Sequence, residues 1–185
     1  MQTDSPDQFS PVTIVLHWIV GIAMIALLAI GVYMTETETY ALYSWHKSFG
    51  FIIFFIVMVR VIWRIKNGWP APIGQHTPFE LSLARIIHWV LILGTVLMPV
   101  SGFLMSSLSG NGVEVFGLEV VARNPDPDNP RQVIPYSETY ASFFHTMHHR
   151  LGYLLIAAVL LHIAGAVKHH LIDKDGTLKR MLGSV

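Results

Sequence analysis

The stretch Met147–His170, MHHRLGYLLIAAVLLHIAGAVKHH, decides how the rest of the sequence is interpreted. As a helix, its apolar run is long enough to cross the hydrocarbon core of a bilayer, which is about 30 Å thick. His148 and His162 are 14 residues apart, so they lie within about 40° of one helix face and about 21 Å apart along the axis. His169 follows about 20° from the same stripe. Polar groups inside a membrane usually serve a function, and we expect two iron porphyrins, one above the other, each bound by one histidine of this helix.

The composition indicates a membrane protein. Apolar residues make up 52% of the chain, charged residues 13%, and the mean hydropathy is +0.51, whereas about a quarter of a soluble domain is charged. Twelve basic and 12 acidic residues balance, so no nucleic-acid partner is expected. The absence of cysteine excludes thiolate metal sites, iron–sulfur clusters and covalently attached haem.

Four apolar segments predict an all-α membrane protein, a four-transmembrane-helix bundle that forms a single domain over residues 1–185. We expect helices at about 12–34, 43–65, 78–108 and 142–171, with an outer loop at 109–141. An early start at Ser137 is the alternative for the last helix. Ser10-Pro11 is a typical helix start, and Thr77 with Glu80 forms a capping box. A signal peptide is the alternative for the first segment, but that segment is too long and lacks a basic start. The charged tail after the last segment is expected to face solvent.

The distribution of basic residues predicts the orientation. One end collects eight: Arg60, Arg64, Lys66, Arg85, Lys168, Lys174, Lys179 and Arg180. The other end has four: Lys47, Arg123, Arg131 and Arg150. Because positive charge is retained on the cytoplasmic side, we expect both termini in the cytoplasm and the long loop outside.

With this topology the histidines form two pairs by depth. His46 and His148 lie at the outer level, and His17 and His162 lie at the inner level. A porphyrin lying against a helix needs a small residue at i+4, which shares the ligand's face. The four candidates are followed at i+4 by Gly21 (His17), Gly50 (His46), Gly152 (His148) and Ala166 (His162). His88 competes with His17 at the inner end, but it is followed by the bulky Ile92.

Each feature also has an ordinary interpretation. Small residues are common in membrane helices because they let helices pack closely, so a single match is weak and four matches at paired depths are stronger. We expect His88 to form a hydrogen bond or contact a propionate, His76 to be ordinary surface, and His145, His149 and His170 to lie at the membrane boundary. The basic side chains of Lys47, Arg60, Arg64 and Arg150 either pair with haem propionates or only obey the charge rule.

Four segments together resemble the bacterial cytochrome b561 family, and the resemblance runs from about Pro11 to Leu182. They are LHWIVGI, WHKSFGFIIFFIVMVRVIWR, RIIHWVLILGTVLMPVSGFLM and LHIAGAVKHHLIDKDGTLKRML. The resemblance implies a four-helix protein of the bacterial inner membrane with two non-covalent b haems, which maps onto the histidine pairs His17/His162 and His46/His148. It also implies that ubiquinone is handled near His169. Family members include a superoxide oxidase that passes electrons from periplasmic superoxide to ubiquinone, and related proteins anchor hydrogenases and formate dehydrogenases.

Three functions remain open. A haem with imidazole on both faces has no open position, so it transfers electrons. The first function is a dihaem oxidoreductase with a small anionic donor, favouring superoxide because no dehydrogenase domain is apparent, and with His169 as proton or hydrogen-bond partner of the quinone. Lys47 and Arg150 would attract such a donor. The second is a haem b subunit that serves a separate dehydrogenase or soluble periplasmic redox partner docking on the outer loop. The third, a zinc transporter, is disfavoured because the predicted helices contain almost no carboxylates.

Overall fold

The computed structural model describes residues 3–5, 8–74 and 76–184, and in this part of the chain four long helices form a bundle. They are α1 (Pro11–Glu36), α2 (Leu42–Asn67), α3 (Pro78–Leu108) and α4 (Glu138–Leu171). Each is long and apolar enough to cross a membrane, which confirms the predicted four-helix membrane fold. Shorter elements follow: β1 (Val113–Val115), β2 (Leu118–Val121) and α5 (Thr177–Leu182).

Side chains cap the starts of α1, α3 and α4. The Ser10 hydroxyl accepts from the backbone N–H of Thr13, and Thr77 and Glu80 form both bonds of a capping box. The last long helix begins at Glu138, one turn before the predicted 142, and the outer loop therefore ends at Ser137. Its first turn is polar, so hydropathy alone did not mark it, although the Ser137 side chain caps it.

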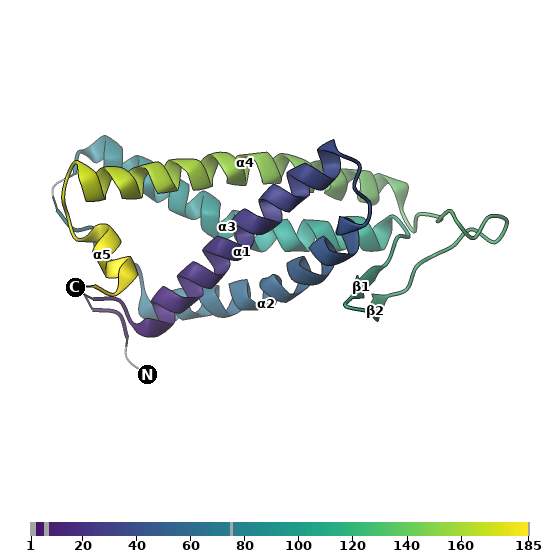
Figure 1. The fold of residues 1–185 in the computed structure, drawn as a ribbon, viewed down its shortest axis with the longest axis horizontal. Helices are drawn as coiled ribbons and strands as arrows, with labels where there is room; N and C mark the ends of the chain where they lie inside the picture. The colour runs from purple at the N-terminus through teal and green to yellow at the C-terminus, as the bar shows by residue number, and fades with distance from the viewer. Residues whose placement is uncertain (1–2, 6–7, 75, 185) are drawn as a thin grey trace.

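The long helices close into a ring, in which α1 packs on α2, α2 on α3, α3 on α4, and α4 on α1. Figure 1 shows α1 crossing the bundle obliquely, with α5 and the start of α1 at one end and the two strands at the other. This arrangement gives the bundle two chemically different ends.

The outer loop contains a β-hairpin that the sequence did not lead us to expect. β1 and β2 pair antiparallel. The turn between them has positive φ at Phe116 (49°) and Gly117 (87°), as a two-residue type I′ hairpin turn requires. The ring of Phe116 lies 5.8 Å from that of Trp45 and 5.3 Å from that of Phe49, and its N–H donates to the Ser48 hydroxyl at 3.1 Å. These contacts hold the hairpin on α2.

We expected the charged tail to face solvent, but part of it is buried. α5 folds back on the start of the chain, where the Arg180 guanidinium lies 4.2 Å from the ring centroid of Phe9. Arg180 is 4% exposed, and the indole N–H of Trp18 donates to the carbonyl of Met181 at 2.9 Å. The prediction failed because it treated charge as a sign of exposure, whereas an arginine can bury its stem and stack on an aromatic ring.

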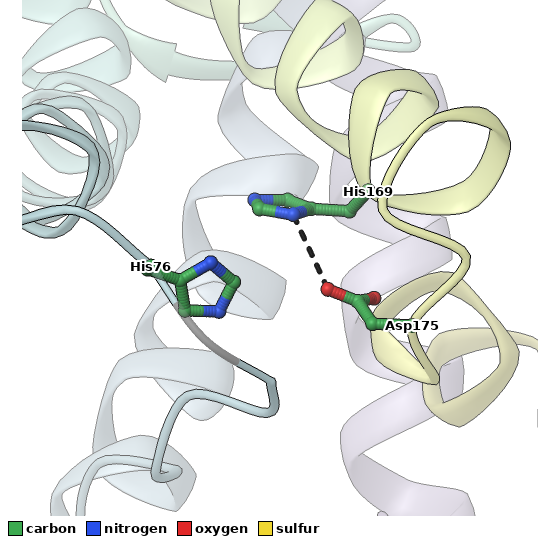
Figure 2. A group of neighbouring side chains, drawn as sticks. All are labelled: His76, His169 and Asp175. Atoms are coloured by element: carbon green, nitrogen blue, oxygen red, sulfur yellow. Dashed lines mark ion pairs between the residues drawn. The ribbon is translucent and has the colours of Figure 1, made fainter.

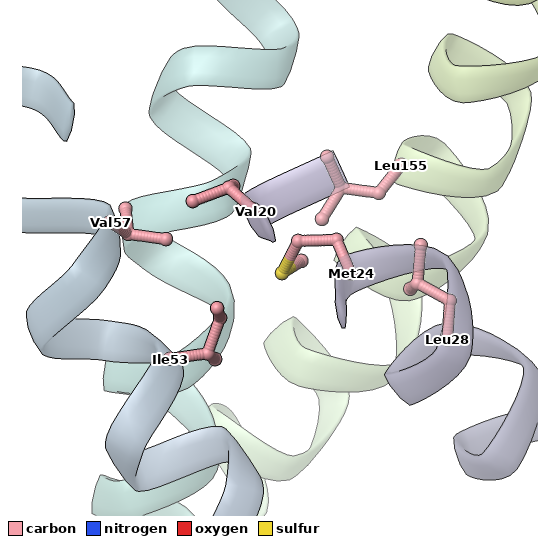
Figure 3. Close-up of a cluster of buried hydrophobic side chains, with 6 residues drawn as sticks. All are labelled: Val20, Met24, Leu28, Ile53, Val57 and Leu155. Atoms are coloured by element: carbon pink, nitrogen blue, oxygen red, sulfur yellow. The ribbon is translucent and has the colours of Figure 1, made fainter. Parts of the chain in front are cut away.

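The core is an apolar layer at mid-bundle (Figure 3). Its most buried members are Val20, Met24 and Leu28 of α1, Ile53 and Val57 of α2, and Leu155 of α4. A Cβ at Gly94 of α3 would lie 2.5 Å from Leu155 Cδ2, so glycine is what lets these two helices approach here. On α4, Leu155 stands midway in sequence between His148 and His162. The core therefore separates two levels of histidines.

Candidate functional site

The outer level brings His46 of α2 to His148 of α4. Their ring centroids are 6.3 Å apart, with the rings at 86° to each other. His148 Nδ1 lies 3.0 Å from the carbonyl oxygen of Met98 and 3.1 Å from the Ser101 hydroxyl. Because a carbonyl only accepts, Nδ1 carries the proton and Nε2 keeps its lone pair. A histidine held in this way by a backbone carbonyl is typical of a metal ligand.

The other outer imidazole has an unsatisfied nitrogen. His46 Nδ1 is buried and has no hydrogen-bond partner among the described residues, which is costly for a polar atom. A small cavity adjoins both rings and is lined by Gly50, Met98 and Pro99 among others. In the described chain, a Cβ at Gly50 would meet no atom within 4 Å. The donor set, the orphaned nitrogen and the space beside Gly50 all fit a flat, metal-containing cofactor.

Two further glycines face the outer rings from neighbouring helices. A Cβ at Gly31 of α1 would lie 3.4 Å from His46 Cε1, and one at Gly102 of α3 would lie 2.9 Å from His148 Cε1. The i+4 pattern in the sequence does not indicate either glycine, because it relates only residues of the ligand's own helix. Gly152, which that pattern does indicate, is buried, and an added Cβ would lie 3.4 Å from Met98 Cε. Residues of both α3 and α4 therefore determine how much space lies next to His148.

The inner level brings together three imidazoles. The His17 and His162 ring centroids are 6.1 Å apart, while His88 lies 5.3 Å from His162. Distance alone therefore does not separate His17 from His88. The solvent-exposed surface favours His17, because His17 and His162 are partly buried by this measure and His88 is exposed. Among the described atoms, a Cβ at Gly21 would have none within 4 Å, and Ala166 is partly buried.

A guanidinium group adjoins the inner imidazoles. Arg60 of α2 places Nη2 3.5 Å from His17 Nδ1. At the outer end, Lys47 donates to the carbonyl of Gly112 at 3.2 Å, so its charge is directed to the hairpin, whereas Arg150 is exposed. His145, His149 and His170 are exposed as well.

His169 lies at the α5 end of the bundle within a polar cluster (Figure 2). Its Nδ1 is 2.8 Å from an Asp173 oxygen and 3.2 Å from an Asp175 oxygen. A hydrogen bond from Lys168 holds the pKa of the Asp173 carboxyl below its ordinary value. The ring of His76 is 4.9 Å from that of His169, so His76 is partly buried in a contact and is not the ordinary surface residue that the sequence suggested.

Comparison with known proteins gives a consistent result over almost the whole chain. A family model described as prokaryotic cytochrome b561 matches residues 8–184. Cytochrome b561 homolog 2 of Escherichia coli (strain K12) is 30% identical over 189 residues, which cover 98% of this chain and 94% of the relative. Cytochrome b561 homolog 1 of the same organism is 28% identical, over 95% and 97% of the two chains. The probable superoxide oxidase CybB of Yersinia pestis is 25% identical, over 95% and 96%.

Proposed function

The chain belongs to the prokaryotic cytochrome b561 family, and on that premise we propose that it passes electrons from a periplasmic donor to ubiquinone through two haems. Membership of the family makes it a multi-pass electron-transfer protein of the bacterial inner membrane with b-type haem. The observation that supports two haems is the pair of imidazole groups at two depths, with the apolar core between them.

In this proposal His46 and His148 hold the outer haem, and His17 and His162 hold the inner one. Each bound haem would supply one-electron chemistry. The Met98 carbonyl orients His148 through Nδ1 and leaves Nε2 for the iron. Arg60 lies beside the inner ligand His17, where it would offset the charge of a propionate. The core excludes water from the space between the two levels.

Superoxide is the donor we favour. The relative from Yersinia pestis is described as a probable superoxide oxidase, and a small anion would be attracted to exposed cations such as Arg150 at the outer end. A soluble redox partner is the second candidate. It is favoured by apolar side chains that the hairpin end exposes, of which Leu118 is 69% and Tyr136 61% exposed.

At the opposite end, His169 would serve the quinone. Reduction of a quinone needs protons as well as electrons, and an imidazole can donate either a proton or a hydrogen bond. Asp173 and Asp175 lie beside His169 Nδ1 and would hold its ring and return its proton.

The experiment begins with haem content in purified variants. Replacement of His46 or His148 by Ala should remove the outer haem and spare the inner one, and replacement of His17 or His162 should do the reverse. His145→Ala is the matched control, because this imidazole is exposed on the same helix as His148. If His88→Ala loses a haem while His17→Ala keeps both, the inner pair is His88 with His162.

The same proteins then test electron transfer. Superoxide added without oxygen should produce the absorbance bands of reduced haem, and ubiquinone should remove them. His169→Ala should still be reduced by superoxide but should be reoxidised by quinone about 10²–10⁴-fold more slowly, the usual contribution of general acid–base catalysis. Reoxidation at the unmodified rate would place the quinone elsewhere. Reduction by a soluble cytochrome and not by superoxide would favour the second candidate.

A further inference from the structure

Three side chains with metal-binding atoms converge at the α5 end of the bundle. His76 comes from the connection before α3, His169 from the last turn of α4, and Asp175 from the connection between α4 and α5. Each offers one ligand atom, and these atoms all lie within 4.8 Å of one another. Figure 2 shows the two rings and the carboxylate pointing toward a common centre.

His76 is already held in the tautomer that a metal requires. Its Nε2 lies 2.6 Å from the carbonyl oxygen of Ile73. Since that oxygen only accepts, Nε2 carries the proton and Nδ1 keeps its lone pair. Metal-binding histidines usually donate their second nitrogen in this way.

Asp175 is an unusually buried carboxylate with one unsatisfied oxygen. Its side chain is 8% exposed, and Oδ1 accepts from the N–H of Thr177 at 2.8 Å. Asp175 Oδ2 lies 3.2 Å from His169 Nδ1, which also has an Asp173 oxygen at 2.8 Å. Neither Asp175 Oδ2 nor His169 Nδ1 has a hydrogen-bond partner of acceptable geometry in the described chain. Two polar atoms that face each other without a well-aligned hydrogen are costly when buried, and a cation between them would satisfy both.

We propose that His76, His169 and Asp175 bind a divalent transition-metal ion of the zinc class. Two imidazoles and one carboxylate are a preferred zinc donor set, with metal–ligand bonds of about 2.0–2.2 Å and a water as fourth ligand. Ligand atoms of such a tetrahedral site are about 3.4 Å apart, so the pair at 3.2 Å already matches. Magnesium and calcium prefer all-oxygen sites, which excludes them here.

Two carboxylates beside the cluster offset the nearby ammonium group of Lys168. Asp173 lies beside His169. Glu80 Oε1 of α3 lies 2.9 Å from Lys168 Nζ. Lys168 also pairs with Asp173 at 2.8 Å, so one ammonium group serves two carboxylates and the charge of Asp175 is left for the metal. A protonated His169 paired with both aspartates is the competing arrangement, and it has no need of His76.

Metal binding would also regulate electron transfer, and this clause rests on the proposed function. A zinc ion on His169 would take the imidazole lone pair and compete with protons and with the quinone. Reoxidation by quinone should therefore slow when zinc is bound. The binding of metal itself does not depend on where the quinone lies.

The test uses purified, haem-loaded protein and zinc chloride in isothermal titration calorimetry. The unmodified protein should bind one zinc ion. His76→Ala and Asp175→Asn should each lower the affinity for zinc at least about tenfold, since even residues that only contact a metal ligand contribute 10–100-fold to affinity. His170→Ala is the matched control, because this exposed histidine is the neighbour of His169, and it should bind like the unmodified protein. An unchanged haem spectrum checks that each variant is folded. Equal zinc affinity in all four proteins would overturn the proposal.

A second measurement separates this inference from the proposed function. For each protein, the rate of haem reoxidation by quinone in the presence of zinc is divided by the rate of the same protein without zinc. Zinc should slow the unmodified protein and His170→Ala, and should leave the ratio near one in His76→Ala. If zinc binds through His76 but has no effect on the rate, zinc does not regulate electron transfer and the quinone does not lie at His169. The metal site itself would still be supported.

Discussion

At the scale of single residues, glycines on α3 and α1 leave room for the imidazoles that we propose as outer ligands. Gly102 is the tightest case, because an added Cβ would lie 2.9 Å from His148 Cε1. The His148 ring cannot move away freely, since its Nδ1 is bonded to Met98 on the same helix as Gly102. The absence of one side chain therefore defines where this ring can lie.

Gly102→Ala should weaken binding of the outer haem and leave the inner one unchanged. Overpacking of this kind usually costs about 1–3 kcal/mol, and here it would displace the ring that we propose as a ligand. Haem content and the absorbance spectrum of the purified variant measure the effect. Gly165→Ala is the control for the outer haem, because Gly165 follows His162 at the inner level and a Cβ there would meet nothing within 4 Å in the described chain. A normal outer haem in Gly102→Ala would contradict the assigned position of His148.

At the scale of elements, one carboxylate joins the N-terminal segment to α1 and α2. Asp4 Oδ2 lies 2.7 Å from Arg64 Nη2 of α2. Asp4 Oδ1 accepts from the Ser10 N–H at 3.0 Å and from the Thr13 hydroxyl at 2.7 Å. Thr13 in turn accepts from the indole N–H of Trp63 at 2.9 Å. The first turn of α1 is thus fastened to the last turns of α2 by charge-assisted hydrogen bonds.

This junction should make stability depend on pH. Burial would raise the pKa of the Asp4 carboxyl, but hydrogen bonds from Ser10, Thr13 and Arg64 outweigh burial, so its pKa lies below the ordinary value. A lowered pKa means that the stabilisation is present above the ordinary aspartate pKa of about 3.9 and is lost as the pH falls through the lowered value. Asp4→Asn should reduce the free energy of unfolding by about 1–3 kcal/mol at neutral pH.

Thermal unfolding in detergent, followed by circular dichroism, measures this difference. The gap in melting temperature between the unmodified protein and Asp4→Asn should be full at pH 7 and should shrink below about pH 4. Asp128→Asn, in the exposed part of the outer loop, should melt like the unmodified protein throughout. A gap that does not change with pH would mean that the Asp4 charge is not what stabilises the junction.

At the scale of the whole molecule, the two ends differ in chemistry. The end with α5 carries the basic tail and the His169 cluster, and the other end carries the hairpin held on α2 (Figure 1). The charge rule predicts that the α5 end faces the cytoplasm. The outer histidine pair would then be nearer the periplasm and His169 nearer the cytoplasmic leaflet.

Reporter fusions test this orientation. Green fluorescent protein at the C-terminus should fluoresce, and alkaline phosphatase at the same place should be inactive, because it folds only in the periplasm. Phosphatase inserted within residues 122–132 of the outer loop should be active. The opposite pattern would reverse the direction of electron flow that we propose.

Local patterns were enough for the membrane class and for most helix ends. Hydropathy over about 20 residues marks a transmembrane helix because the bilayer thickness sets its length, and caps such as Ser10 and Thr77 act within one turn. The spacing of His148 and His162 likewise puts them on one face because helix periodicity is local. The rings that were paired by depth, His46 with His148 and His17 with His162, do lie close together in the structure. The roles of these residues as haem ligands stay predictions.

Other features depend on how separate segments pack. The rotation of each helix about its axis decides that Gly31 and Gly102 face the imidazoles and that His88 also comes near His162. The hairpin is held by Phe116 on aromatic rings of α2, far from it in sequence. His76 and Asp175 are about a hundred residues apart, and they meet only because α3 and α4 pack side by side. Side-chain contacts over such separations are set by tertiary packing, which no local period in the sequence encodes.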